Sequence, residues 1–215
     1  MRSACRPTYS GIAPVSVENS GDVHAASDHA LAVAIIASTD ADYGPVSVVN
    51  EGDLTAISGR LGSPAYAVTF GGGSPVAIEN SGNIQAEGPT AFGIRAKAYG
   101  ANSPISVTNS GDIDPVTGID VRTYGDHSPI AVDNSGDVEA TQVGILALSD
   151  GANSSVSIAN SGDVTTTGAS IYESAAIIGV ASGADSSVVI NNSGTAQGLG
   201  PFGVGVYARP IPSPP

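Results

Sequence analysis

The chain has 215 residues, and its 20 acidic and seven basic side chains give a formal net charge of -13. Such a charge repels phosphate backbones and anionic lipid, so the composition excludes a nucleic-acid-binding protein. The chain contains 28 Gly and no Trp, and its small and β-branched side chains favour stacked strands over helices. A single cysteine, Cys5, excludes an intramolecular disulfide.

The two ends of the chain differ in composition from its middle. MRSACRPTYS at 1–10 lacks the apolar segment of a signal peptide. The most apolar stretch, ALAVAIIA at 30–37, is shorter than the ~20 residues that cross a bilayer, so we expect no membrane insertion. We predict an unstructured segment over residues 1–10, a repeat domain over residues 11–208 and a Pro-rich tail over residues 209–215.

One short turn recurs seven times along the repeat domain, first as NSGD at 19–22. An asparagine opens each copy, at spacings of 25 to 32 residues: Asn19, Asn50, Asn80, Asn109, Asn134, Asn160 and Asn192. A glycine follows two residues later in each copy: Gly21, Gly52, Gly82, Gly111, Gly136, Gly162 and Gly194. The turn is therefore the landmark that aligns the repeats.

Short strands surround each turn. Val or Ile stands four and two residues before every Asn, as at Val15 and Val17, and this alternation predicts a strand. A second strand begins four residues after each Asn, and a third follows a loop of variable length, as in AFGIRAKAYG at 91–100. Repeats of this size bury an apolar face only by stacking. We therefore predict an all-β fold, a parallel β-helix solenoid of about seven rungs with three strands each.

The recurring turn has a predicted role for each of its residues. The Asn has the same parity as the inward Val and Ile, so we expect a buried ladder of stacked amides. We expect the Gly to supply a positive φ at the corner. The Asp that usually follows, as at Asp22, is expected to hydrogen-bond the backbone within its own turn.

The repeat rhythm resembles a known family. V-x-V-x-N-S-G-D-I, followed by G-I-x-A and then G-x-x-S-P, is similar to the passenger region of bacterial autotransporters and filamentous adhesins, over residues 11 to about 208. The resemblance implies a right-handed parallel β-helix, display at the bacterial cell surface or outer membrane or secretion, and adhesion to cell-surface glycans or proteins without enzymatic activity. The chain departs from the family in showing no signal peptide and no translocator barrel, which predicts a fragment, a truncated reading frame or an orphan passenger-like segment. Uncapped first and last rungs predict end-to-end self-association.

A calcium site is the first candidate for specific chemistry. Asp112, Asp137 and Asp163 are expected to stack on consecutive rungs with oxygens suited to Ca²⁺. Asn83 and Thr195 interrupt this column, and the spacing differs from the nonapeptide repeat of calcium-binding rolls. The sequence therefore favours solvated turn residues and no cofactor.

A charged patch on the third strand is the second candidate. We expect Arg95 to stack over Asp120 and Lys97 over Arg122, with the cations facing water. One interpretation is an exposed salt bridge of modest strength. The other is a binding site for an anionic sugar.

Catalysis receives less support from the sequence. Parallel β-helices also include polysaccharide lyases and hydrolases, which need clustered carboxylates. In this chain the acids fall mostly at repeating corners, and the exposed strand positions carry Ser, Thr and Ala. His24, His29 and His127 form no recognisable catalytic order with Ser and Asp. We therefore predict a non-enzymatic scaffold, with a carbohydrate-active β-helix enzyme as the alternative.

Overall fold

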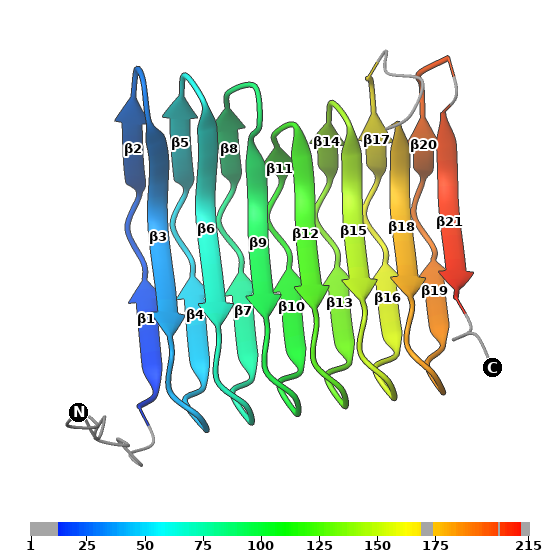
Figure 1. Ribbon diagram of the computed structural model, residues 1–215. Coiled ribbons are helices and arrows are strands. Elements are labelled where there is room, and N and C mark those ends of the chain that lie inside the picture. Colours follow the sequence, from blue (N-terminus) through cyan, green and yellow to red (C-terminus); the bar gives the residue numbers. More distant parts are fainter. Residues whose placement is uncertain (1–12, 169–173, 202, 212–215) are drawn as a thin grey trace.

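The computed structural model describes residues 13–168, 174–201 and 203–211. Its strands form three parallel sheets of seven strands, and each turn of the chain adds one strand to each sheet (Figure 1). This confirms the predicted all-β, parallel β-helix solenoid of about seven rungs with three strands per rung. Among the described residues, no helix has the length and apolar character that crossing a membrane requires.

The three sheets are named A, B and C in the order in which the chain enters them. Sheet A consists of β1 (Val15–Asn19), β4 (Val46–Asn50), β7 (Val76–Asn80), β10 (Ile105–Asn109), β13 (Ile130–Asn134), β16 (Val156–Asn160) and β19 (Val188–Asn192). Sheet B consists of β2 (Val23–Ser27), β5 (Leu54–Ser58), β8 (Ile84–Glu87), β11 (Ile113–Asp114), β14 (Val138–Ala140), β17 (Val164–Thr166) and β20 (Ala196–Gly198). Sheet C consists of β3 (Leu31–Thr39), β6 (Leu61–Thr69), β9 (Phe92–Ala98), β12 (Thr117–Thr123), β15 (Val143–Ser149), β18 (Ala175–Ala181) and β21 (Val204–Pro210).

Loops between sheets B and C absorb the variation in repeat length. β11 ends at Asp114 and β12 begins at Thr117, whereas β17 ends at Thr166 and β18 begins only at Ala175. The last strand, β21, runs to Pro210, two residues beyond the domain boundary expected at 208. The predicted N-terminal segment 1–10 lies outside the described residues.

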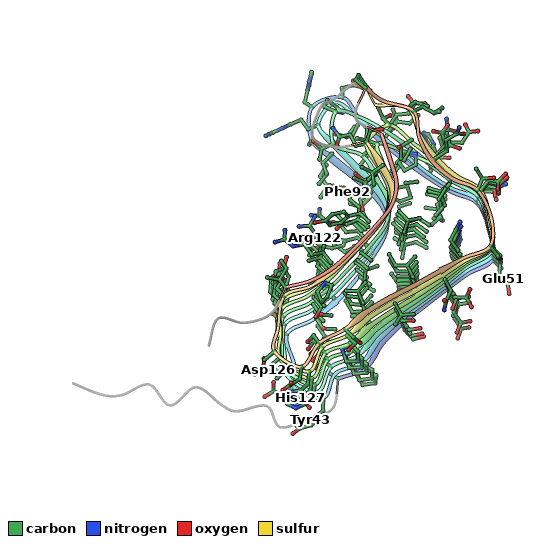
Figure 2. All side chains as sticks on the ribbon, turned by 90° about the vertical axis from the view of Figure 1, so that its right-hand side faces the viewer. Tyr43, Glu51, Phe92, Arg122, Asp126 and His127 are labelled. Atoms are coloured by element: carbon green, nitrogen blue, oxygen red, sulfur yellow. The ribbon has the colours of Figure 1, made fainter. Side chains whose placement is uncertain are left out.

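Columns of β-branched side chains fill the interior. Ile94, Ile119, Ile145 and Ile177 lie in register on β9, β12, β15 and β18, and each is 0% exposed. Burial of one such side chain contributes roughly 1.5–3 kcal/mol. Figure 2 looks along the stack and shows columns of side chains enclosed by the three sheets.

A ladder of asparagines holds the corner between sheets A and B, which Glu51 marks in Figure 2. From Asn19 to Asn192, the Nδ2 of each Asn donates to the Oδ1 of the next at 2.7–2.8 Å. The same Nδ2 also donates to the carbonyl of the glycine in its own turn, at 2.5–2.7 Å. Asn50 through Asn160 are buried. Each inner amide is therefore bonded both within its turn and to the neighbouring rung.

The turn glycines serve a different purpose from the predicted one. Among the described glycines, only Gly73 and Gly88 have a positive φ, so the prediction of positive φ at the seven turn glycines is wrong. A Cβ added at Gly136 would lie 2.1 Å from the carbonyl oxygen of Gly111, and the other stacked turns are equally close. Successive turns pack backbone against backbone, and only glycine leaves room for this approach.

A second ladder, not predicted from the sequence, holds the corner between sheets C and A (Figure 2). Ser74, Ser103, Ser128 and Ser154 are 0% exposed, and the Oγ of each accepts from the backbone N–H of the preceding rung at 2.9–3.0 Å. The residue before each serine is left-handed, with φ near +55° at Asn102 (φ 55) and His127 (φ 55). This conformation favours Gly, Asn and Asp, and Asn occupies the position at Asn102 and Asn153. The constant glycine of G-x-x-S-P has another cause, because a Cβ added at Gly125 would lie 2.2 Å from the carbonyl oxygen of Gly100.

Candidate functional site

The outer faces of sheets A and B match the predicted Ser, Thr and Ala surface only in part. One outward column of sheet A contains only small side chains over its first six rungs: Ser16, Ser47, Ala77, Ser106, Ala131 and Ser157. The outward column of sheet B is polar: His24, Thr55, Gln85, Asp114, Glu139, Thr165 and Gln197 on successive strands. Neither column combines aromatic with cationic residues.

The outer face of sheet C departs from that expectation. Its first outward column runs Ile36, Tyr66, Arg95, Asp120, Leu146, Ile178 and Tyr207. Its second runs Ser38, Val68, Lys97, Arg122, Leu148, Val180 and Arg209. The prediction that exposed strand positions carry Ser, Thr and Ala is wrong here, because this face is apolar, aromatic and cationic.

Positive charge is concentrated on the same face. The chain has seven Lys and Arg, of which Arg2 and Arg6 lie outside the described residues, which leaves five. Four of these five lie on the outer face of sheet C, and the exception is Arg60, exposed between β5 and β6. In a chain of charge -13, this grouping creates a local patch of opposite sign.

Asp120 forms the centre of the cluster composed of Arg95, Lys97, Asp120 and Arg122. The register places Arg95 beside Asp120 and Lys97 beside Arg122, as the sequence predicted. The Asp120 side chain is 0% exposed, however, so the salt bridge predicted to be exposed is buried at its acidic end. Its Oδ1 accepts from Nε of Arg122 at 2.7 Å. Its Oδ2 lies 3.2 Å from Nε of Arg95, an ion pair without hydrogen-bond alignment.

Aromatic rings cover Arg95. Its Cζ lies 4.2 Å from the ring centroid of Phe92 and 5.7 Å from that of Tyr66, both within cation–π range. The side chain is consequently only 19% exposed and does not face water as predicted. Phe92 and Arg122 both lie on the outer side of sheet C in Figure 2. Arg95 and its aromatic neighbours thus form the floor of the cluster.

Lys97 and Arg122 provide the more accessible charges. Burial alone would lower the pKa of Arg122, but the hydrogen bond to Asp120 and its charge raise that pKa above the usual value. Burial, followed by the charge of Arg95, lowers the pKa of Lys97 below its usual value. Within the described part of the chain, Lys97 takes part in no ion pair. The cluster therefore has three cations and one acid, an excess of positive charge.

Three aromatic rings stack beside the cluster. Phe70, Tyr99 and Tyr124 directly follow β6, β9 and β12 on successive rungs, with ring centroids 5.1 Å and 4.7 Å apart and nearly parallel planes. Tyr99 is 41% and Tyr124 37% exposed. Tyr99 stacks between Phe70 and Tyr124, so it presents mainly its edge and hydroxyl group to a ligand, and Tyr124 stacks on Tyr99 through one face.

A shallow acidic groove of about 460 Å³ lies on the outer face of sheet B, lined by Asp53, Asp112, Asp114, Asp137 and Glu139 among others. The Oδ1 of Asp112, Asp137 and Asp163 accepts the backbone N–H of the next rung at 2.8–3.0 Å. This bond crosses between rungs and does not stay within one turn as predicted. Among the described residues, no group of three His, Cys, Asp or Glu side chains is arranged to hold a metal ion.

Several residues of the sheet C face were not singled out from the sequence. Tyr66 shares the outward column of Arg95, and Tyr99 and Tyr124 follow Lys97 and Arg122 by two residues, a spacing that places them on the same face. That period-two relation was the signal that could have identified them. No family model, curated protein or solved structure matches the chain.

Proposed function

We propose that this chain is a non-enzymatic β-helix scaffold, similar to an autotransporter passenger, that binds cell-surface glycans or proteins through the outer face of sheet C. In this proposal the chain is secreted or displayed at the bacterial cell surface. The sheets and their corner ladders keep the face rigid, and the side chains of β6, β9 and β12 supply recognition.

The contrast among the outer faces carries this proposal. Sheets A and B present mainly small, polar or acidic side chains with single aliphatic ones such as Val49 and Ile57, whereas sheet C combines aromatic, aliphatic and cationic side chains on adjacent rungs. Exposed tyrosines and arginines are the residue types that most often dominate binding energy at interfaces. A surface that only had to be solvated would not need them.

The arrangement of the acids supports a binding role over catalysis. Both carboxylate oxygens of Asp120 face guanidinium groups and the side chain is fully buried, so it is poorly placed to act as a base or nucleophile. The corner acids are separated from this cluster and hydrogen-bond the backbone of adjacent rungs.

A polysaccharide lyase or hydrolase is the second candidate, and one observation favours it. The lowered pKa of Lys97 is a property of lysines that act as general bases, and Arg122 lies beside it. New reducing ends formed from uronic-acid polymers, and lost in Lys97→Gln, Asp120→Ala and Arg122→Ala, would establish the enzyme and contradict the non-enzymatic scaffold.

Site-directed shielding tests the proposed binding face. In a Cys5→Ser background, Ile36→Cys on sheet C and Ser106→Cys on sheet A each receive a polyethylene glycol maleimide, and binding of the labelled proteins to intact cells is measured by flow cytometry. Both positions are exposed, so both accept the label. We expect the sheet C label to abolish binding and the sheet A label to leave it intact. Equal binding by both would overturn the assignment of the face.

A further inference from the structure

Arg122 is held in a pose suited to an external anion. Its Nε donates to the buried Asp120, which fixes the plane of the guanidinium, while the side chain stays 32% exposed. A guanidinium carries its five donors in a rigid planar fork, so holding Nε directs the two Nη groups. A carboxylate fits this kind of edge through two parallel hydrogen bonds.

Lys97 adds a second donor at the same place. It is the register partner of Arg122 on the adjacent strand, so the two side chains leave the sheet about 4.8 Å apart. The Lys97 side chain is half-buried, with Arg95 two residues before it on its own strand and Arg122 in register on the next. Burial and the charges of these two arginines lower the pKa of Lys97, and the charge of Asp120 opposes them. An anion bound here would relieve this excess of positive charge.

We infer that Lys97 and Arg122 form a binding site for the carboxylate groups of an acidic polysaccharide, such as a polymer of uronic acids. This inference rests on the proposed function, because it names the ligand class of the same face. The carboxylate lies between Nζ of Lys97 and the Nη edge of Arg122, and Tyr99 and Tyr124 contact the sugar hydroxyls.

The surroundings favour a polysaccharide over an acidic peptide. β9 and β12 are paired on both sides within sheet C, so they offer no free backbone edge to which an extended peptide could add as a strand. The exposed edges of Tyr99 and Tyr124, one rung apart, supply phenol groups beside the two cations. Phenols and cations in this pattern match the hydroxyl and carboxylate groups of a uronate.

Titration calorimetry with oligogalacturonate as the probe tests the inference. Arg122→Gln and Lys97→Gln each remove one cation from the cluster, and Arg60→Gln removes one from the turn between β5 and β6. We expect the Kd to rise at least about tenfold in the double variant Lys97→Gln/Arg122→Gln and to change by less than about twofold in Arg60→Gln. Lys97→Arg keeps the charge and should retain binding, and circular dichroism checks that each variant keeps its strand content.

Three outcomes would overturn the inference. Equal affinity for neutral galactan oligomers would show that the carboxylate is not recognised, and equal affinity for polyglutamate would assign the site to acidic peptides. Unchanged oligogalacturonate affinity in the double variant would place any binding elsewhere. The cell-binding test is independent of these three outcomes. If labelling of Ile36→Cys abolishes cell binding, sheet C remains the proposed binding face even where uronate is not its ligand. A wrong ligand class and a wrong function therefore give different results.

Discussion

The asparagine corner and the outer face of sheet C use the same rung stacking in opposite ways. At the corner, every rung contributes the same residue, and each Asn bonds an identical neighbour above or below it. On the outer face, adjacent rungs contribute Tyr66, Arg95, Asp120 and Leu146 at equivalent positions. Repetition at the corner gives every rung the same hydrogen bonds between side-chain amides and from amide to backbone carbonyl. Its loss on the outer face creates a local surface of mixed chemistry.

This contrast separates residues that hold the solenoid together from residues that are free to recognise a ligand. A substitution at the corner disturbs the two neighbouring rungs, because each inner Asn hydrogen-bonds the Asn of both. An exchange on the outer face affects mainly the side chains around it. Stability and binding should therefore respond to different substitutions, and the following variants test this.

The largest effect on stability is expected from Gly136→Ala. The added Cβ would lie 2.1 Å from the carbonyl oxygen of Gly111, and backbone cannot yield as a side chain would. We expect the rungs to be forced apart at a cost of about 3 kcal/mol, read from chemical denaturation. Gly21→Ala is the matched control, since a Cβ at Gly21 meets nothing within 4 Å. Equal midpoints for the two variants would refute the backbone-contact explanation.

A smaller loss is expected from Asn134→Leu. The substitution removes the amide that donates to Asn160 and accepts from Asn109, and it leaves their polar groups buried without a partner. We expect a cost of about 2 kcal/mol in unfolding free energy. Ser106→Thr, on the exposed side of the neighbouring strand, should be nearly silent. If the Leu variant is as stable as the Thr variant, the ladder does not stabilise the fold.

The smallest effect concerns Asp163, on the solvent side of the same corner. The backbone N–H of Thr195, followed by its side chain, holds the pKa of Asp163 below its usual value. A depressed pKa contributes stability above the unfolded value of about 3.9, and this contribution is lost as the pH falls through the folded value. The denaturant midpoint of Asp163→Ala should therefore approach that of the parent chain in acid. The gap between Asp163→Asn and Asp163→Ala should stay constant with pH, because neither side chain ionises.

The fold could be predicted from the sequence because its signals repeat. Seven copies of the Asn turn, with the alternating Val and Ile before it, indicated the first two strands of each repeat and their stacking. The alignment of AFGIRAKAYG at 91–100 with VTGIDVRTYG at 116–125 in the third strand placed Arg95 beside Asp120. The role of the turn glycines could not be predicted, because the close approach of Gly111 and Gly136 depends on contact between rungs. The serine column was visible in the G-x-x-S-P rhythm, but its hydrogen bonds run from one rung to the next, and its left-handed position varies among Tyr43, Asn102 and Asp185, so the ladder was not predicted.

The site could be predicted only in part, because contacts between side chains of different strands decide which of its residues are exposed. Arg95, Lys97, Asp120 and Arg122 were recognised as a charged patch, and register alone was enough to place them together. The complete burial of Asp120 depends on its neighbours across the strands, and the cover over Arg95 comes from Phe92 and Tyr66. A pattern that treats alternate strand positions as exposed cannot detect side chains that bury one another on the outer face.

The most direct test compares Lys97→Gln with Asn134→Leu in two measurements, the denaturant midpoint and the Kd for oligogalacturonate. Because the fold lowers the pKa of Lys97, it disfavours the charged form, and Lys97→Gln should leave the midpoint at neutral pH unchanged or slightly raised. The same variant should raise the Kd at least about fivefold. Asn134→Leu should lower the midpoint and, where the protein is folded, leave the Kd unchanged. A Lys97→Gln protein that is less stable but binds normally would contradict the division between a structural corner and a recognising face.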